Sequence, residues 1–178
     1  MDPQRRPAWS PFFNAGCAVV VHSRPTLYDM NHDPLAKTRA DVEKYGWHCL
    51  HVAPRVGESG ANFAYTIGLF ETYGHPEIMI FGLGRESAHG VLRECADMIK
   101  VGTRFPVGQP VQDVLSGDFP VIFKAIKLEH YDEYLGTAMR YYGAKPFDAW
   151  VLFWPDKDYK FAWESEKLPS QEEALNVI

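Results

Sequence analysis

The stretch from residue 63 to residue 83, FAYTIGLFETYGHPEIMIFGL, constrains the fold more than any other part of the chain. The apolar runs at residues 62–67 and 77–83 have the β-branched and aromatic composition of buried strands. The Gly, Tyr-Gly and His-Pro-Glu groups between them interrupt any long helix, because Gly and Pro are unfavourable inside helices. The stretch therefore predicts two strands of a sheet with a turn-rich connection.

The patterns elsewhere predict further strands at residues 47–53, 119–129 and 149–154, and helices at residues 34–45, 85–101 and 131–142. In the helix at 85–101, the apolar side chains recur at helical spacing, at Ala88, Val91, Leu92, Cys95, Met98 and Ile99. Strands at 47–53 and 62–67 pair as a hairpin, and helices follow later in the chain. This order predicts an α+β fold with a mixed, mainly antiparallel sheet of about five to six strands and two to three packed helices.

The expected domain organisation is simple. An irregular N-terminal arm at residues 1–33 is rich in proline, a single α+β domain covers residues 34–164, and an acidic C-terminal tail covers residues 165–178. A doubly wound nucleotide-binding fold is not expected, because the chain has no G-x-G-x-x-G turn and no Walker loop.

Composition and charge exclude several classes of protein. The net charge is −5, from 18 Lys plus Arg and 23 Asp plus Glu, so nucleic-acid binding through phosphate contacts is not expected. No apolar run approaches the roughly 18 residues of a membrane span. Cys17, Cys49 and Cys95 are odd in number and far apart, which favours reduced thiols in the cytoplasm over a disulfide framework or a metal site. Cofactor requirement and oligomeric state stay open.

A set of motifs resembles one known family. Gly46-Trp47 is followed by FAYTIGL at 63–69, GHPE at 74–77, GL at 82–83, WPD at 154–156 and WE at 163–164. In this order they are similar to the bacterial DUF4262 family, a family of domains of unknown function, over roughly residues 42–164. The chain departs from the family pattern at Ala162, where the family tends to have a Pro before the Trp. The resemblance implies a shared fold and a shared set of unusual residues, without an assigned reaction.

The His75-Pro76-Glu77 triplet is the main catalytic candidate. Proline favours an extended conformation at the residue before it, and residues two apart in an extended chain point to the same side. His75 and Glu77 are therefore expected to share a site, with His75 as general base and Glu77 as an orienting or metal-binding carboxylate. Asp156 is the predicted third member, because a His-Glu pair alone holds no metal firmly and specifies no nucleophile. The alternative is a purely structural turn that opens a strand.

Other residues are candidates for ligand binding. Thr66 offers a hydroxyl beside the bare backbone of Gly68, and Arg85 at a helix start could bind an anion together with the free N–H groups of that helix. The tryptophans could form the wall of a pocket for a planar ligand. The full set is Tyr65, Thr66, Gly68, Arg85, Trp154 and Trp163. Core packing is the competing interpretation of the aromatic members, and no metal site is predicted, because His48 and His51 project to opposite faces of a strand.

Three functions follow from these candidates. The first is binding of a small ligand, either as a binding protein or as an enzyme, at a site built from the YTIG, HPE and WPD segments. The second is a non-catalytic interaction module, in which the arm or the acidic tail contacts a protein partner. The third is a flavin-binding oxidoreductase, because the segment from Asn62 through the HPE triplet faintly resembles a unit of the split-barrel flavin reductases.

Overall fold

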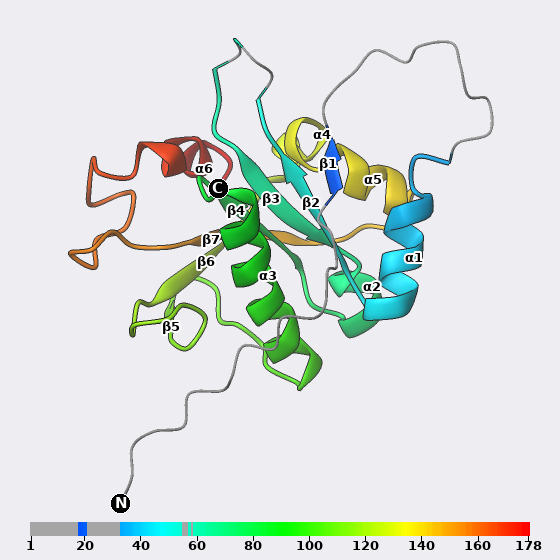
Figure 1. The fold of residues 1–178 in the computed structure, drawn as a ribbon, viewed down its shortest axis with the longest axis horizontal. Helices are drawn as coiled ribbons and strands as arrows, with labels where there is room; N and C mark the ends of the chain where they lie inside the picture. The colour runs from blue at the N-terminus through cyan, green and yellow to red at the C-terminus, as the bar shows by residue number, and fades with distance from the viewer. Residues whose placement is uncertain (1–17, 21–32, 55–56, 58) are drawn as a thin grey trace, which may run out of the picture.

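A single mixed sheet forms the centre of the molecule, with the strand order β1-β2-β3-β4-β7-β6-β5 (Figure 1). The computed structural model describes residues 18–20, 33–54, 57 and 59–178. The strands are β1 (Ala18–Val20), β2 (His48–Val52), β3 (Phe63–Ile67), β4 (Glu77–Phe81), β5 (Pro110–Val111), β6 (Val121–Ala125) and β7 (Ala149–Phe153). Among the strand pairs of the described residues, β1–β2 and β4–β7 are parallel and the other four are antiparallel. The expected α+β class and mainly antiparallel sheet are confirmed, and the hairpin of β2 and β3 is present as predicted.

Helices cover both faces of this sheet. They are α1 (Ala36–Tyr45), α2 (Leu69–Tyr73), α3 (Arg85–Lys100), α4 (Tyr131–Tyr134), α5 (Gly136–Tyr142) and α6 (Glu172–Asn176), with short 3-10 turns at Leu128–His130 and Pro169–Gln171. The long helix α3 crosses one face (Figure 1) and buries Ala88, Leu92, Cys95, Ala96 and Ile99 against it. Side chains of α4, α5 and α6 pack on the other face. We call these the α3 face and the α5 face.

Strand β4 shows how the alternation of a strand builds two cores. Ile78 and Ile80 pack on the α3 face, whereas Met79 and Phe81 pack on the α5 face, and all are fully buried. Cys49 and Leu50 of β2 likewise separate onto the α3 and α5 faces, as the strand pattern predicts. A strand covered on both faces has few polar residues, which explains why β4 reads as one apolar run.

Two predicted elements differ in detail. The helix expected at residues 131–142 is divided into α4 and α5 at Leu135, whose side chain is fully buried. Gly136 follows the break, and glycine is a poor residue for continuing a helix. The connection after Gly68 contains the short helix α2, which lies between Gly68 and Gly74, both with positive φ. Glycine adopts this left-handed conformation without the steric cost of a Cβ atom.

The segment expected as an acidic tail, residues 165–178, packs on the domain. Ala174 and Val177 are buried in the core of the α5 face, and the Lys127 N–H donates to the Val177 carbonyl at 2.9 Å. The C-terminal segment is therefore part of the folded unit. The expected arm at residues 1–33 lies outside the described residues, apart from β1 and Asp33.

Candidate functional site

The carboxylate of Glu77 is the most densely hydrogen-bonded side chain of the predicted site. Its Oε2 accepts a bond from the Thr66 hydroxyl at 2.5 Å. Its Oε1 accepts bonds from the backbone N–H of Gly68 at 2.9 Å and of Phe70 at 3.1 Å, and from the Tyr142 hydroxyl. Thus the expected neighbours Thr66 and Gly68 do meet Glu77, and Tyr142 of α5 is a partner that sequence reasoning missed.

This carboxylate has no exposed surface. Burial raises the pKa of Glu77, while the donors from Thr66, Tyr142 and the start of α2 oppose that shift. The Thr66 oxygen also accepts a bond from the Ile78 N–H at 2.9 Å, so the hydroxyl is engaged on both sides. Because every group in this network is paired with another protein group, the arrangement supports a structural role in which Glu77 joins β3, β4, α2 and α5.

His75 does not share a side with Glu77, and the expectation that Pro76 holds the two together is wrong. The His75 ring packs edge-on against Phe105 and Trp150 on the α3 face, at centroid distances of 5.6 and 5.1 Å. Its Nδ1 lies 2.8 Å from the Pro76 carbonyl oxygen, which makes Nδ1 the donor. Regular pairing starts only at Glu77, so the alternation rule for strands does not extend back to His75.

The WPD segment lies at the other end of the sheet from Glu77. β4 and β7 are parallel, with Glu77 opposite Ala149, so Trp154 and Asp156 follow the carboxyl end of β7. The five residues of β7 span about 16 Å at about 3.3 Å per residue. The expected convergence of the YTIG, HPE and WPD segments on one site is therefore wrong, because a parallel pair places these motifs at opposite ends.

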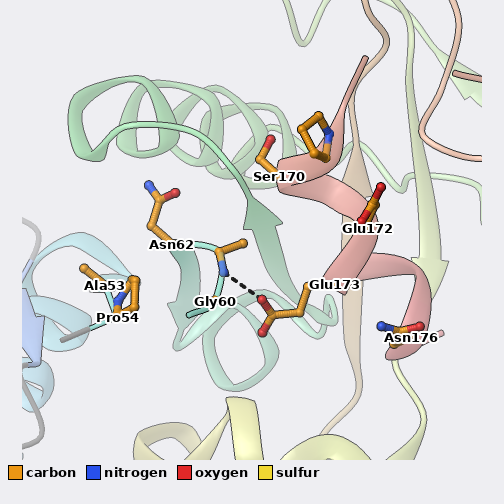
Figure 2. A pocket seen from close by; sticks show the side chains of 10 residues that line it. Ala53, Pro54, Gly60, Asn62, Ser170, Glu172, Glu173 and Asn176 are labelled. Atoms are coloured by element: carbon orange, nitrogen blue, oxygen red, sulfur yellow. Dashed lines mark hydrogen bonds between the residues drawn. The ribbon is translucent and has the colours of Figure 1, made fainter. Parts of the chain in front are cut away.

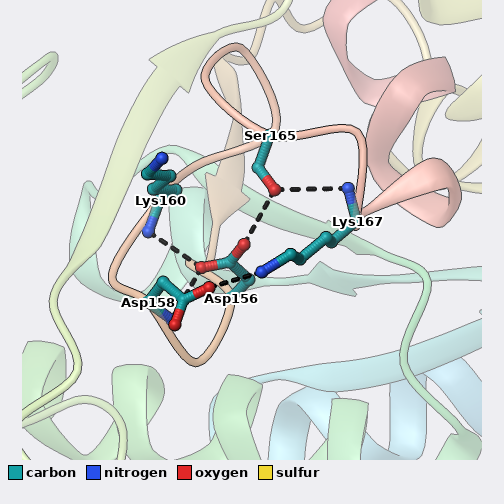
Figure 3. Close-up of polar contacts among 5 residues, drawn as sticks. All are labelled: Asp156, Asp158, Lys160, Ser165 and Lys167. Carbon is teal, nitrogen blue, oxygen red and sulfur yellow. Dashed lines mark hydrogen bonds and ion pairs between the residues drawn. The ribbon is translucent and has the colours of Figure 1, made fainter.

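Asp156 organises its own loop (Figure 3). Its Oδ1 accepts bonds from the N–H groups of Asp158 at 2.8 Å and Lys160 at 3.1 Å, and its Oδ2 accepts one from the Ser165 hydroxyl at 2.7 Å. The bond from Ser165 is the main cause that holds the pKa of Asp156 below its usual value. The salt bridge of Lys167 with Asp158 closes the same loop. The geometry supports a loop-shaping role for this carboxylate.

The predicted ligand-binding aromatics are largely occupied by protein contacts. Tyr65 is 1% exposed, and burial raises its pKa to about 12. The Trp163 ring is partly exposed, but it stacks on Phe161 with a centroid distance of 4.9 Å, and the Lys124 ammonium lies 4.1 Å from its centroid. Trp154 is held at the carboxyl end of β7 by its indole N–H, which donates to the Phe81 carbonyl at 3.2 Å.

An open cleft of about 750 Å³ lies at this same end of the sheet (Figure 2). It is bounded by residues that follow β2, residues that precede β3, and the C-terminal segment. An adjoining cleft of about 390 Å³ extends toward Tyr134. The described residues lining the larger cleft are Ala53, Pro54, Gly60, Ala61, Asn62, Pro169, Ser170, Glu172, Glu173 and Asn176.

Glu173 stands on the walls of both clefts. Its carboxylate accepts bonds from the Ala61 N–H at 2.7 Å and the Tyr134 hydroxyl at 2.9 Å. Burial and this carboxylate raise the pKa of Tyr134. Sequence reasoning missed Glu173, because the segment was assigned to a tail. Pro169 near a helix start, followed by the apolar residue Ala174, was the available signal.

The C-terminal segment also binds the backbone that continues β7. The Gln171 side chain donates from Nε2 to the Trp154 carbonyl at 2.8 Å and accepts from the Trp154 N–H at 3.3 Å. Gln171 is 1% exposed. One side chain therefore satisfies both backbone groups of Trp154, in the way a neighbouring strand would.

The turn between β4 and α3 contacts two residues that line the cleft, Asn62 and Ser170. The Gly82 N–H donates to the Asn62 carbonyl at 2.8 Å, and the Asn62 side chain donates to the Leu83 carbonyl at 2.5 Å. A Cβ atom at Gly82, where φ is +78°, would lie 2.3 Å from the Ser170 hydroxyl oxygen. Glycine is required here by both conformation and space. Arg85, the first residue of α3, therefore lies at the cleft end of the sheet.

The described residues contain no group of three or more His, Cys, Asp or Glu side chains placed to hold a metal ion. The Nδ1 atom of His48 forms a hydrogen bond with the Asp41 carboxylate at a distance of 2.7 Å. No helix in the described part of the chain is long and apolar enough to cross a membrane.

Comparison with known proteins gives one match. A family model described as a domain of unknown function (DUF4262) matches residues 41–167. The searches of curated proteins and of solved structures give no significant match.

Proposed function

The chain belongs to the DUF4262 family, and from that premise we propose that it binds a small polar ligand in the cleft between the β2–β3 connection and the C-terminal segment. The observation that carries the proposal is that the two sides of the β2–β3 connection, residues 53–54 and residues 60–62, bound one cleft together with residues 169–176, which lie more than 100 positions later in the chain. The family description names no activity, so the proposal rests on this geometry.

Size, position and chemistry support the cleft as the site. Its volume of about 750 Å³ lies within the roughly 300–1,000 Å³ that is usual for small-molecule sites. The cleft lies beside the connection between β2 and β3, at the end of the sheet where β4 and β7 also end. Polar side chains of Asn62, Ser170 and Asn176 line the cleft and offer hydrogen-bonding groups to a ligand, whereas the Glu173 carboxylate already accepts bonds from Ala61 and Tyr134.

We propose binding, without assigning a reaction. The trio of His75, Glu77 and Asp156 does not support catalysis, because His75 and Glu77 are fully buried and Asp156 is engaged within its loop. Arg85 stays a proposed ligand-binding residue because it follows a turn that contacts Asn62, which lines the cleft. A cytoplasmic location is supported by Cys95, a fully buried free thiol.

A blocking substitution tests the cleft. Ala53→Trp places an indole at the exposed rim, and Ala144→Trp places the same indole on an exposed loop between α5 and β7, at the opposite end of the sheet. Amide chemical shifts are recorded while a set of small polar fragments is titrated into each protein. We expect fragments to perturb the amides of Ala61 and Asn62, and we expect Ala53→Trp alone to abolish that response.

Other outcomes would decide against the proposal. If no fragment perturbs the cleft, or if both tryptophan variants bind alike, the cleft is not a ligand site. Capture of a protein partner that survives Ala53→Trp would favour the interaction module instead. The flavin alternative has no supporting observation, since the described sheet is open, with β1 and β5 at its edges.

A further inference from the structure

The walls of the two adjoining clefts carry charge of one sign. Glu172 and Glu173 line the larger cleft, and Glu133 and Glu173 line the smaller one. The described residues that line either cleft include no Lys, Arg or His. A concave surface with charges of one sign raises the local concentration of ions of the opposite sign. Among small polar ligands, the clefts therefore favour those that carry a positive charge.

Two of these carboxylates meet at the hydroxyl group of Tyr134. The hydroxyl donates to Glu173 at 2.9 Å, and the Glu133 carboxylate also interacts with it. A phenol has one proton to donate, so it satisfies one of the two carboxylates at a time. A cation with several N–H groups would reduce the repulsion between the carboxylates and donate to the one that Tyr134 leaves unpaired.

The smaller cleft also offers apolar surface for the uncharged part of such a ligand. Its volume is about 390 Å³, and its apolar lining includes Val52, Pro54, Phe63 and Tyr134. The rings of Phe63 and Tyr134 lie close together, with their centroids 5.5 Å apart. Aromatic rings attract a cation within about 6 Å of the centroid, and aliphatic groups gain from burial against the same walls. Charge and apolar surface together fit an organic cation.

Glu173 is held in a fixed position where the two clefts adjoin. Its side chain extends from α6 toward residues 60–62 (Figure 2), and the Ala61 N–H donates to it at 2.7 Å. Ala61 and Tyr134 bind different oxygens of the carboxylate, so each oxygen keeps a second lone pair for a ligand. A calcium ion needs about six to eight oxygen ligands, whereas an ammonium group needs only a few acceptors. An ammonium group therefore suits these two carboxylates better than a metal ion.

We propose that Glu133 and Glu173 bind the ammonium group of a small organic amine in the smaller cleft, and that the rest of the ligand continues into the larger cleft. The inference rests on the proposed function and names the ligand class. Ala53, Pro54, Gly60, Ala61 and Glu173 line both clefts, so one ligand can contact both.

The test is a titration of the full chain with n-butylammonium chloride at constant ionic strength and neutral pH, followed by amide chemical shifts. Sodium butyrate and n-butanol are the anionic and neutral probes of similar size. We expect saturable shifts at Ala61, Asn62 and Phe63 with n-butylammonium. n-Butanol should bind about fivefold more weakly, because it lacks the charge, and butyrate should give no saturable shift.

Two matched variants locate the charge. Glu133→Gln keeps the size of an exposed side chain and removes its charge, which should weaken n-butylammonium binding about two- to fivefold. Asp132→Asn removes the same charge from the preceding exposed residue of α4, which lines neither cleft, and should leave the affinity unaltered. Glu172→Gln, in the larger cleft alone, should have a smaller effect than Glu133→Gln.

Several results would overturn the amine inference. These are n-butylammonium that binds no better than n-butanol or butyrate, equal affinities in Glu133→Gln and Asp132→Asn, or a larger loss in Glu172→Gln than in Glu133→Gln. If other fragments then still perturb Ala61 and Asn62 and are blocked by Ala53→Trp, the cleft proposal stands without the amine. If no fragment of any charge perturbs these amides, both proposals fail.

Discussion

The Glu77 network predicts a strong thermodynamic coupling between β4 and α5. Tyr142→Phe removes one hydroxyl that donates to a fully buried carboxylate, with little change in packing volume. A hydrogen bond to a charged group contributes about 1.5–3 kcal/mol, so we expect the free energy of unfolding to fall by about 2 kcal/mol. Glu77→Gln should cost about 3 kcal/mol, because its amide NH₂ then faces donors rather than acceptors.

The double variant, Tyr142→Phe with Glu77→Gln, tests whether the two side chains contribute to stability through one shared hydrogen bond. Once Glu77 is replaced, the Tyr142 hydroxyl has lost its charged acceptor, so the combined loss should be smaller than the sum by about 1–2 kcal/mol. Urea denaturation followed by tryptophan fluorescence and circular dichroism measures each value. The matched control is Tyr141→Phe, which removes a hydroxyl that donates at 2.7 Å to the exposed carboxylate of Glu71. Its cost should be under about 0.5 kcal/mol. Equal costs at Tyr141 and Tyr142, or additive double-variant costs, would refute the structural role assigned to Glu77.

Two further perturbations follow from buried residues. Burial lowers the pKa of His75, so below pH 6.5 the unfolded chain binds a proton that the folded chain does not. As the pH falls from 6.5 toward the pKa of the folded state, this residue should therefore lower the free energy of unfolding by about 1.4 kcal/mol per pH unit. His75→Gln should remove this contribution to the pH dependence. Urea midpoints that change equally with pH in the two proteins would contradict the prediction. Gly68→Ala should destabilise by about 2 kcal/mol or more, because φ is +110° and the new Cβ would lie 2.7 Å from Val42 Cγ2. Gly90→Ala, at a position of α3 where a Cβ atom meets no other atom within 4 Å, should instead stabilise the protein by about 0.5–1 kcal/mol. A melting temperature of Gly68→Ala equal to or above that of Gly90→Ala would contradict the steric account.

Local patterns predicted most of the strands and the long helix. The alternation in β4 and the apolar stripe of α3 come from side chains that repeat every two or about 3.6 residues, and both patterns are visible without tertiary information. The same alternation separated His48 from His51. These features depend on residues close together in the chain.

The candidate site depended on long-range pairing and was predicted less well. Thr66 and Gly68 were correctly placed near Glu77, but Tyr142 is 65 positions away from Glu77 and carries no local signal. The prediction placed His75 on the same side of the sheet as Glu77, which is wrong. His75 lies in a turn before the strand, where its ring donates to the Pro76 carbonyl and the alternation of strand side chains does not apply. The parallel pairing of β4 with β7, which separates Glu77 from Asp156, is likewise invisible in either motif alone.

The bidentate contact of Gln171 with Trp154 bears on where the folding unit ends. The family match stops at residue 167, four positions before the amide that completes the hydrogen bonding of the chain beyond β7. A fragment cut to the matched boundaries would leave two backbone groups of Trp154 unpaired and would uncover the core where Ala174 and Val177 now sit. The end of the family match and the end of the cooperatively folded unit thus fall at different residues. Biophysical work on this protein should therefore retain residues 168–178, the last eleven of the chain.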